Sequence, residues 1–159
     1  MRGRALPATF RRCAVTEVAS LAGLFAAALL AATIVPAQSE ALLVALIVAG
    51  DVAPWLLVAV ASVGNVMGSV INWVLGRGLE RFKDRRWFPV SPGALARAEG
   101  WYRRWGRWSL LLAWMPVIGD PLTVVAGTLR EPLRTFVPLV AAGKVARYAV
   151  LALGTSAAA

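Results

Sequence analysis

Two carboxylates interrupt the apolar parts of the sequence, each at the same distance from a proline. Glu40 follows Pro36 by four residues, and Asp120 follows Pro116 by four. A carboxylate in an apolar environment normally faces a cavity or a cationic partner, because its desolvation is costly. Burial favours the protonated acid and a nearby cation favours the carboxylate, so an acid balanced between these effects can bind and release a proton. We therefore interpret Glu40 and Asp120 as proton-coupling residues; capping of the following helix is the simpler alternative.

Three cations lie in or beside apolar segments and could bind an anion. Lys144 and Arg147 are three residues apart on one face of the last apolar helix, and Arg77 ends the central apolar run. Buried cations near acids form salt bridges or receive an anionic head group, and arginine suits bidentate phosphate recognition. We expect these residues to form an anionic head-group site, although Arg77 also fits a side chain that snorkels to the membrane interface.

Small residues give the central apolar run a face for close packing. Gly64 and Gly68 have the G-x-x-x-G spacing, which lets two helices approach closely in a membrane. Asn65 lies between them and needs hydrogen-bond partners wherever it is buried. We expect the glycines to pack against another helix, and Asn65 to bridge to Glu40 or to a substrate.

The composition argues against most enzymes. The 159 residues include 17 Lys and Arg against 8 Asp and Glu, a formal charge of +9, with no His and one cysteine, Cys13. Without His there is no Ser-His-Asp or Cys-His catalysis, and one thiol makes neither a disulfide nor a thiolate cage. We expect no enzyme, no metal and no cofactor, although two carboxylates alone can support acid–base chemistry. The mean hydropathy of +0.68 argues against nucleic acid as the partner of the basic charge.

Long uncharged runs predict an all-α integral membrane protein. Residues 18–39 and 52–76 carry no charge over 22 and 25 positions. A bilayer needs about 20 apolar residues per helical span. Shorter apolar runs follow at residues 108–119, 121–129, 135–143 and 148–159. The first helix is expected to start near Thr16, and the protein to cross a membrane several times.

The prolines break two of these runs into hairpins. Pro36 cannot lie inside a straight helix, and residues 18–50 are too long for one span and too short for two. Pro116, Gly119 and Pro121 surround Asp120 in a second break between pieces that are too short to cross alone. Irregular backbone at membrane depth must be enclosed in protein or face a water-filled cavity. We therefore expect two re-entrant helical hairpins that face inward.

The two breaks resemble each other and suggest an inverted repeat. In each, a stretch of small and apolar residues follows the acid and ends in Ala49-Gly50 or Ala126-Gly127. Gly64-Asn65 lies 24 residues after Glu40, and Gly143-Lys144 lies 23 after Asp120. Paired interrupted segments in two halves of a chain indicate a transport site at the interface of the repeats.

These features divide one predicted domain, residues 1–159, into four segments. They are a basic arm (1–15), the first hairpin and span (16–78), a basic interfacial segment (79–107), and the second hairpin with the last helix (108–159). An amphipathic helix is expected to begin at Ser91-Pro92 and to lie on an anionic membrane surface. A solvated loop whose arginines orient the protein is the alternative. Because both basic segments favour the cytoplasm, the orientation stays open.

The motifs together resemble the DedA family, the bacterial branch of the SNARE-associated or VTT-type membrane proteins, and in particular its short YqaA-type members. The resemblance covers most of residues 18–150. It is carried by Pro36-Ala37-Gln38-Ser39-Glu40, Gly64-Asn65-Val66-Met67-Gly68, Leu75-Gly76-Arg77, Trp114-Met115-Pro116-Val117-Ile118-Gly119-Asp120, Ala126-Gly127 and Gly143-Lys144-Val145-Ala146-Arg147-Tyr148.

The resemblance implies two opposed re-entrant hairpins, with the family's hairpin acids at Glu40 and Asp120. It also implies a multi-pass protein of the bacterial inner membrane and lipid translocation, in particular return of the carrier lipid undecaprenyl phosphate across that membrane, driven by the proton motive force. Expected partners are membrane lipids, either a polyprenyl phosphate or an anionic phospholipid, and a homo-oligomer is compatible with the pattern. Many longer members carry arginines three residues on either side of the second proline, where this chain has Ala113 and Gly119. Their role would have to move to other cations, or the substrate would have to differ.

Two other functions remain open from the sequence. The same acids and broken helices would suit a carrier or channel for a small ion or solute. A groove open to the side favours lipid, and a closed aqueous path favours a small solute. A non-transporting assembly factor, docking through the basic residues of 77–107, is the third hypothesis.

Overall fold

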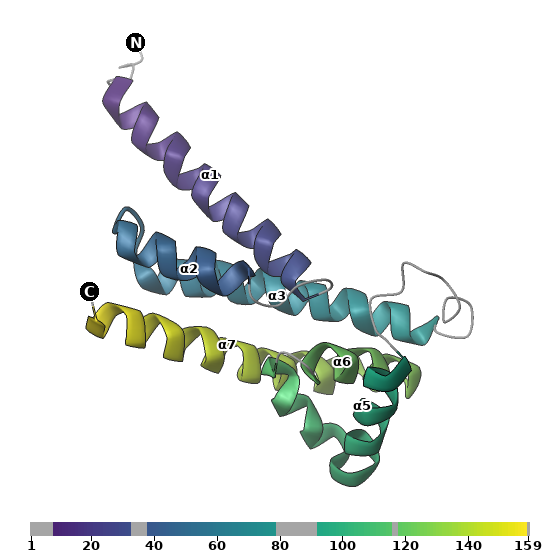
Figure 1. Ribbon diagram of the computed structural model, residues 1–159. Helices are drawn as coiled ribbons and strands as arrows, with labels where there is room; N and C mark the ends of the chain where they lie inside the picture. The colour runs from purple at the N-terminus through teal and green to yellow at the C-terminus, as the bar shows by residue number, and fades with distance from the viewer. Residues whose placement is uncertain (1–7, 33–37, 79–91, 116–117, 159) are drawn as a thin grey trace.

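The computed structural model describes residues 8–32, 38–78, 92–115 and 118–158, and these contain helices and no strand, as predicted. The helices are α1 (Ala8–Ala31), α2 (Gln38–Ala49), α3 (Pro54–Arg77), α5 (Pro92–Trp105), the 3₁₀-helix η1 (Gly106–Trp114), α6 (Gly119–Thr128) and α7 (Leu133–Ala158) (Figure 1). The first helix begins at Ala8, so the expected start near Thr16 was wrong. Between Ala8 and Gly23 the sequence contains neither proline nor glycine, and nothing there ends a helix.

The two longest apolar helices, α3 and α7, form the centre of the molecule. They have 24 and 26 residues and are long and apolar enough to cross a membrane. Their lengths of about 36 and 39 Å exceed the roughly 30 Å hydrocarbon core of a bilayer. The ring of Trp73 contacts the ring of Phe136, with centroids 6.2 Å apart, and Asn65 contacts Lys144. The two helices therefore run antiparallel, with the C-terminal half of α3 beside the N-terminal half of α7.

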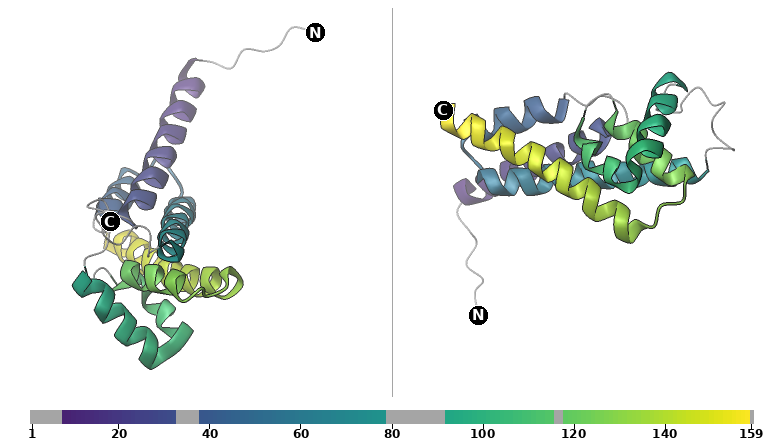
Figure 2. Two further views of the ribbon diagram at one scale, coloured as in Figure 1. Left: turned by 90° about the vertical axis from the view of Figure 1, so that its right-hand side faces the viewer. Right: turned by 90° about the horizontal axis from the view of Figure 1, so that it is seen from below.

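The short helices α2 and α6 start near the middle of α7 and run to opposite ends of the molecule (Figures 1 and 2). Ser39, at the start of α2, contacts Tyr148, whereas Val48 near its end shares a cavity with Thr155. Gly127, at the far end of α6, packs against the backbone of Trp73. Each short helix thus packs on the long helix of the other half of the chain.

Glycines bring α1 close to α3. A Cβ on Gly64 would lie 2.6 Å from the carbonyl oxygen of Phe25, and one on Gly68 would lie 2.6 Å from that of Leu29. Such approaches leave no room for a side chain, because real Cβ atoms do not come so near to backbone oxygens. The G-x-x-x-G face therefore receives α1.

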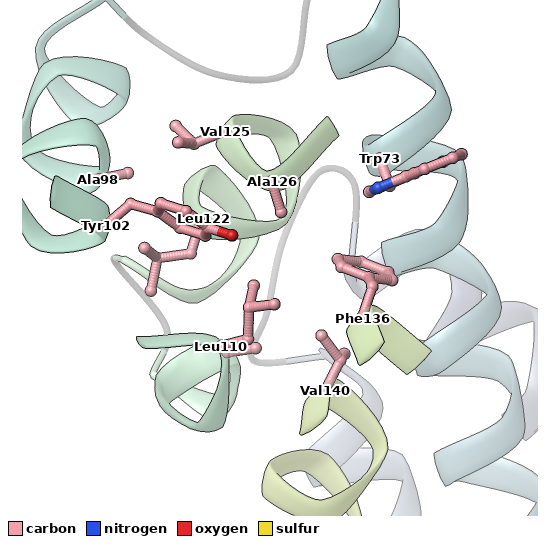
Figure 3. Packing of buried hydrophobic residues seen from close by; sticks show 10 residues of the cluster. Trp73, Ala98, Tyr102, Leu110, Leu122, Val125, Ala126, Phe136 and Val140 are labelled. Carbon is pink, nitrogen blue, oxygen red and sulfur yellow. The ribbon is translucent and has the colours of Figure 1, made fainter. Parts of the chain in front are cut away.

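A hydrophobic cluster ties α5 to the second half of the bundle (Figure 3). Ala98 and Tyr102 of α5 are buried in it, and the Tyr102 hydroxyl donates to Glu131 Oε2 at 2.6 Å. Burial, together with the Glu131 carboxylate, raises the pKa of the Tyr102 phenol, which stays protonated. The amphipathic helix predicted from Ser91-Pro92 is confirmed as α5. Its other face exposes tryptophan and arginine, with Trp105 58% exposed.

Candidate functional site

The second acid pairs with a buried lysine. Asp120 lies in the first turn of α6, and its Oδ1 is 3.3 Å from Nζ of Lys144 in the middle of α7. The two side chains are 22% and 5% exposed. Ile118 occupies the N-cap position of α6, where no side chain caps the helix, so capping does not explain Asp120. The carboxylate still gains from the positive end of the helix dipole.

Lys144 connects this pair to α3 and then to α2. Its ammonium also donates to Asn65 Oδ1 and to the Asn65 carbonyl oxygen, the latter at 3.5 Å. Asn65 Nδ2 donates to the Tyr148 hydroxyl at 2.7 Å, and that hydroxyl lies 3.0 Å from Ser39 Oγ. The hydrogen bonds therefore form one continuous network across α6, α7, α3 and α2.

The first acid pairs with the second cation of α7. Glu40, in the first turn of α2, forms an ion pair with Arg147. Arg147 Nη1 also donates to the carbonyl oxygen of Trp114, the last residue of η1, at 2.6 Å. The guanidinium therefore contacts an acid in the first turn of α2 and a carbonyl oxygen in the last turn of η1. The second contact is the favourable one for a cation at a helix end, because the carbonyl end of a helix is negative.

One face of α7 gathers all these contacts. Lys144, Arg147 and Tyr148 are spaced by three and four residues and thus lie one above another. Gly143, beside them, lets η1 approach, since a Cβ there would lie 2.6 Å from the Leu111 carbonyl oxygen. A Cβ on Gly119 would collide with the Ala113 carbonyl oxygen, so the start of α6 packs tightly against the end of η1, and Asp120 lies beside Lys144 of α7.

Two cavities flank the charged residues. A small one of about 10 Å³ is lined by residues that include Asn65, Asp120, Lys144 and Tyr148; this is about the space of one water molecule. A second, of about 580 Å³, opens on the outer surface, where Trp114 and Val150 are exposed. Its walls include Glu40, Leu111, Trp114, Arg147, Val150 and Leu151. We call this second cavity the side groove.

The structure does not bring every predicted residue to this site. Arg77 is exposed, and its guanidinium lies 4.6 Å from the centroid of the Trp73 ring. Twelve residues of helix separate Arg77 from Asn65, about 18 Å along α3, so Arg77 is not part of the Lys144 and Arg147 cluster. Pro36 and Pro116 lie outside the described residues. Pro121 is buried in the first turn of α6.

Sequence reasoning missed the roles of Tyr148, Ser39 and the Trp114 carbonyl. Tyr148 is fully enclosed and joins Asn65 to Ser39. Its position four residues after Lys144 was the available signal, since that spacing places both side chains on one helix face. Asn65 reaches the first break through Tyr148 and not through Glu40, the partner that the sequence suggested.

Replacing Tyr148 with phenylalanine is expected to lower the free energy of unfolding by about 1–2 kcal/mol, because the Ser39 and Asn65 side chains lose a buried partner. Thermal unfolding in detergent measures the loss. Ser62→Ala is the matched control. Ser62 Oγ is also buried but has no hydrogen-bond partner within the described residues, so its removal should leave stability unchanged. Equal stability of Tyr148→Phe and the parent would show that the network does not hold α2 to α3.

These features define a class: a helical membrane protein in which broken helices present acids to cations on one long apolar helix. The VTT domain matches residues 35–156, and the chain belongs to this family, as the resemblance to the DedA family predicted.

The relatives agree with this assignment. The chain is 39% identical over 141 residues to "Inner membrane protein YqaA" of Escherichia coli K12, covering 89% of this chain and 94% of that protein. The protein of the same name from Shigella flexneri matches equally. An uncharacterized protein of Haemophilus influenzae is 33% identical over 139 residues, covering 83% of this chain and 85% of its own length. These names state no catalytic activity. No solved structure shows significant similarity to the chain.

Proposed function

We propose that this protein is a multi-pass inner-membrane transporter that moves an anionic lipid, such as the carrier undecaprenyl phosphate, between leaflets with coupling to protons. Glu40 and Asp120 are the proton-coupling residues at the tips of two re-entrant hairpins, and Arg147 with Lys144 receives the phosphate. The observation that carries the proposal is the Glu40–Arg147 ion pair in the wall of an apolar groove that opens to the side.

The shape of the site favours a lipid over a small solute. The cavity between the charges has a volume of about 10 Å³, the space of about one water molecule, which is too small for a hydrated ion. The side groove is far larger, and its charged residues stand among apolar walls. A lipid presents the matching surface, because its head group is ionic and its chains remain in hydrocarbon.

The depth of the charge pairs supports a transport site. Arg147 lies about 21 Å from the start of α7 and about 17 Å from its end, so a spanning α7 places the guanidinium near the middle of the bilayer. Charges at that depth are functional in most membrane proteins. The helices α2 and α6 start there and leave toward opposite ends, which is the arrangement we assign to opposed re-entrant hairpins in an inverted repeat.

Arg147 takes the place of the missing hairpin arginines. Its guanidinium binds the Trp114 carbonyl, next to Ala113, and so reaches the second hairpin from α7. A side chain at position 119 would collide with the Ala113 carbonyl. An arginine therefore has no room at position 119, and Arg147 of α7 places a positive charge beside this hairpin instead.

Proton coupling follows from competition for Arg147. While Glu40 is ionised, its carboxylate holds the guanidinium that a lipid phosphate would need. Protonation of Glu40 weakens the pair and frees Arg147 for the phosphate, and loss of the proton expels the lipid. Asp120 and Lys144 form the second such pair, one helical turn away.

Reconstitution in proteoliposomes tests the proposal. With fluorescent undecaprenyl phosphate and a pH gradient, Glu40→Gln and Asp120→Asn should each lower the translocation rate by about a hundredfold or more, the range that one general acid or base supplies. The Glu40→Gln protein should still bind the lipid, since Arg147 is left without its competitor.

Gly23→Ala is the matched control for reconstitution, because Gly23 is exposed on α1 with open space around it. Unchanged rates in both acid variants would remove the proton-coupling role. Transport of a small ion above the rate of empty vesicles, with lipid translocation no faster than in empty vesicles, would make the protein an ion or solute carrier.

A further inference from the structure

A second apolar cavity continues the side groove toward the C-terminal end of α7. It holds about 620 Å³, and Val150 and Leu151 line both cavities. Its other walls come from Val44 and Val48 of α2 and from Gly154, Thr155 and Ala158 of α7. The two cavities therefore adjoin along the surface of α7, and we call the pair the α2–α7 groove.

Residue spacing on both helices produces this groove. On α2, Glu40, Val44 and Val48 recur every four residues and form one stripe that faces α7. On α7, Arg147, Leu151 and Thr155 form the opposite stripe with the same spacing. Each stripe begins with a member of the ion pair and continues with small or apolar side chains, so the groove is charged at one end only.

The groove beyond the ion pair offers no polar side chain to a ligand. Thr155 is the single hydroxyl among the described residues that line the second cavity, and its Oγ1 donates to the Leu151 carbonyl at 2.8 Å. Val48 and Val150 are 63% and 69% exposed, so the apolar walls lie open at the surface of the helix pair. Such a surface is complementary to hydrocarbon.

The length of the groove fits a lipid chain. From Arg147 of the ion pair, the residues of α7 that line the groove extend to Ala158, about 17 Å along the helix, and one leaflet of hydrocarbon is about 15 Å thick. A chain that starts at the ion pair can therefore remain in contact with protein over the whole depth of a leaflet.

We propose that the α2–α7 groove binds the hydrocarbon chain of the lipid whose phosphate binds Arg147. This inference rests on the proposed function and adds a preference for long chains to it. The groove begins at the ion pair. Its charged end matches the lipid phosphate, and its apolar walls match the hydrocarbon chain. A second copy of the chain would instead bury the Glu40 and Arg147 charges against a protein surface, at a desolvation cost that a lipid phosphate avoids.

Filling the groove tests the inference. A Cβ on Gly154 would meet nothing within 4 Å, so Gly154→Phe should fold and occupy the space of the chain. Native mass spectrometry in detergent would measure the affinities of dioleoyl and dihexanoyl phosphatidic acid. In Gly154→Phe, we expect the ratio of the affinity for dioleoyl to that for dihexanoyl phosphatidic acid to fall by about tenfold. That is the effect of losing about two buried methylene contacts. Gly154→Leu should lower the ratio less.

Two further variants separate the possible failures. Gly23→Phe, which also has open space around it on α1, should retain the long-chain preference. Arg147→Gln should weaken both lipids alike, because it removes the phosphate partner. An unchanged preference in Gly154→Phe would overturn the chain groove while leaving the proposed function intact. Unchanged binding of both lipids to Arg147→Gln would overturn the head-group site itself. A changed oligomeric state with an unchanged lipid preference would assign the groove to a second copy.

Discussion

Replacing Lys144 with methionine is expected to lower the free energy of unfolding by about 3–5 kcal/mol, because the change leaves the Asp120 carboxylate without its cation. The Lys144 side chain is 5% exposed and donates to Asp120 and to both oxygens of Asn65. Methionine fills a similar volume but makes none of these bonds. Unfolding in mixed micelles, followed by loss of helical circular dichroism, measures the change.

The double variant Asp120→Asn with Lys144→Met separates stability from function. Because it contains no unpaired charge, it should recover most of the stability that the single lysine variant loses. Its lipid translocation should stay at the background rate, since it lacks both a titrating acid and its cation. If Lys144→Met unfolds like the parent, the pair contributes nothing to the fold. Recovery of translocation in the double variant would exclude Asp120 from proton coupling.

The sequence located the carboxylates and two of the cations, because charge in an apolar run is rare and therefore informative. Asp120 and Lys144 were expected to have opposite charges nearby, and the structure pairs them. The sequence could not say which acid meets which cation. Lys144 and Arg147 differ by less than one helical turn, so a small rotation of α7 would exchange their partners.

Other features depend on packing that no short pattern encodes. Arg77 was grouped with the α7 cations, although its place at the end of an apolar run also fitted a side chain that snorkels; in the structure it is exposed and its guanidinium lies over the Trp73 ring. Tyr148 begins a predicted apolar run, yet its hydroxyl joins α3 to α2. The side groove arises because η1, α2 and α7 meet. The contacts between α2 and α7 join residues as far as 109 positions apart.

Replacing Gly127 with valine is expected to lower the free energy of unfolding by more than about 3 kcal/mol, the upper part of the range for overpacked cores. Gly127 of α6 and Gly76 of α3 face each other. A Cβ on Gly127 would collide with the carbonyl oxygen of Trp73, and one on Gly76 would collide with that of Val124. The obstacle is backbone in both cases, so no side chain can rotate away and the helices must separate.

Separation of α3 and α6 would also disturb the site. The Trp73 indole donates to the Glu131 carbonyl at 3.0 Å and so fixes the turn between α6 and α7. When α6 moves, Asp120 at its other end moves away from Lys144. Thermal unfolding in detergent compares Gly127→Val with Gly23→Val, which adds the same side chain at an open position and should keep the parent's stability. A Gly127→Val protein as stable as this control would mean that α3 and α6 do not need close backbone contact, and the position of Asp120 would then have to be set by α7 alone.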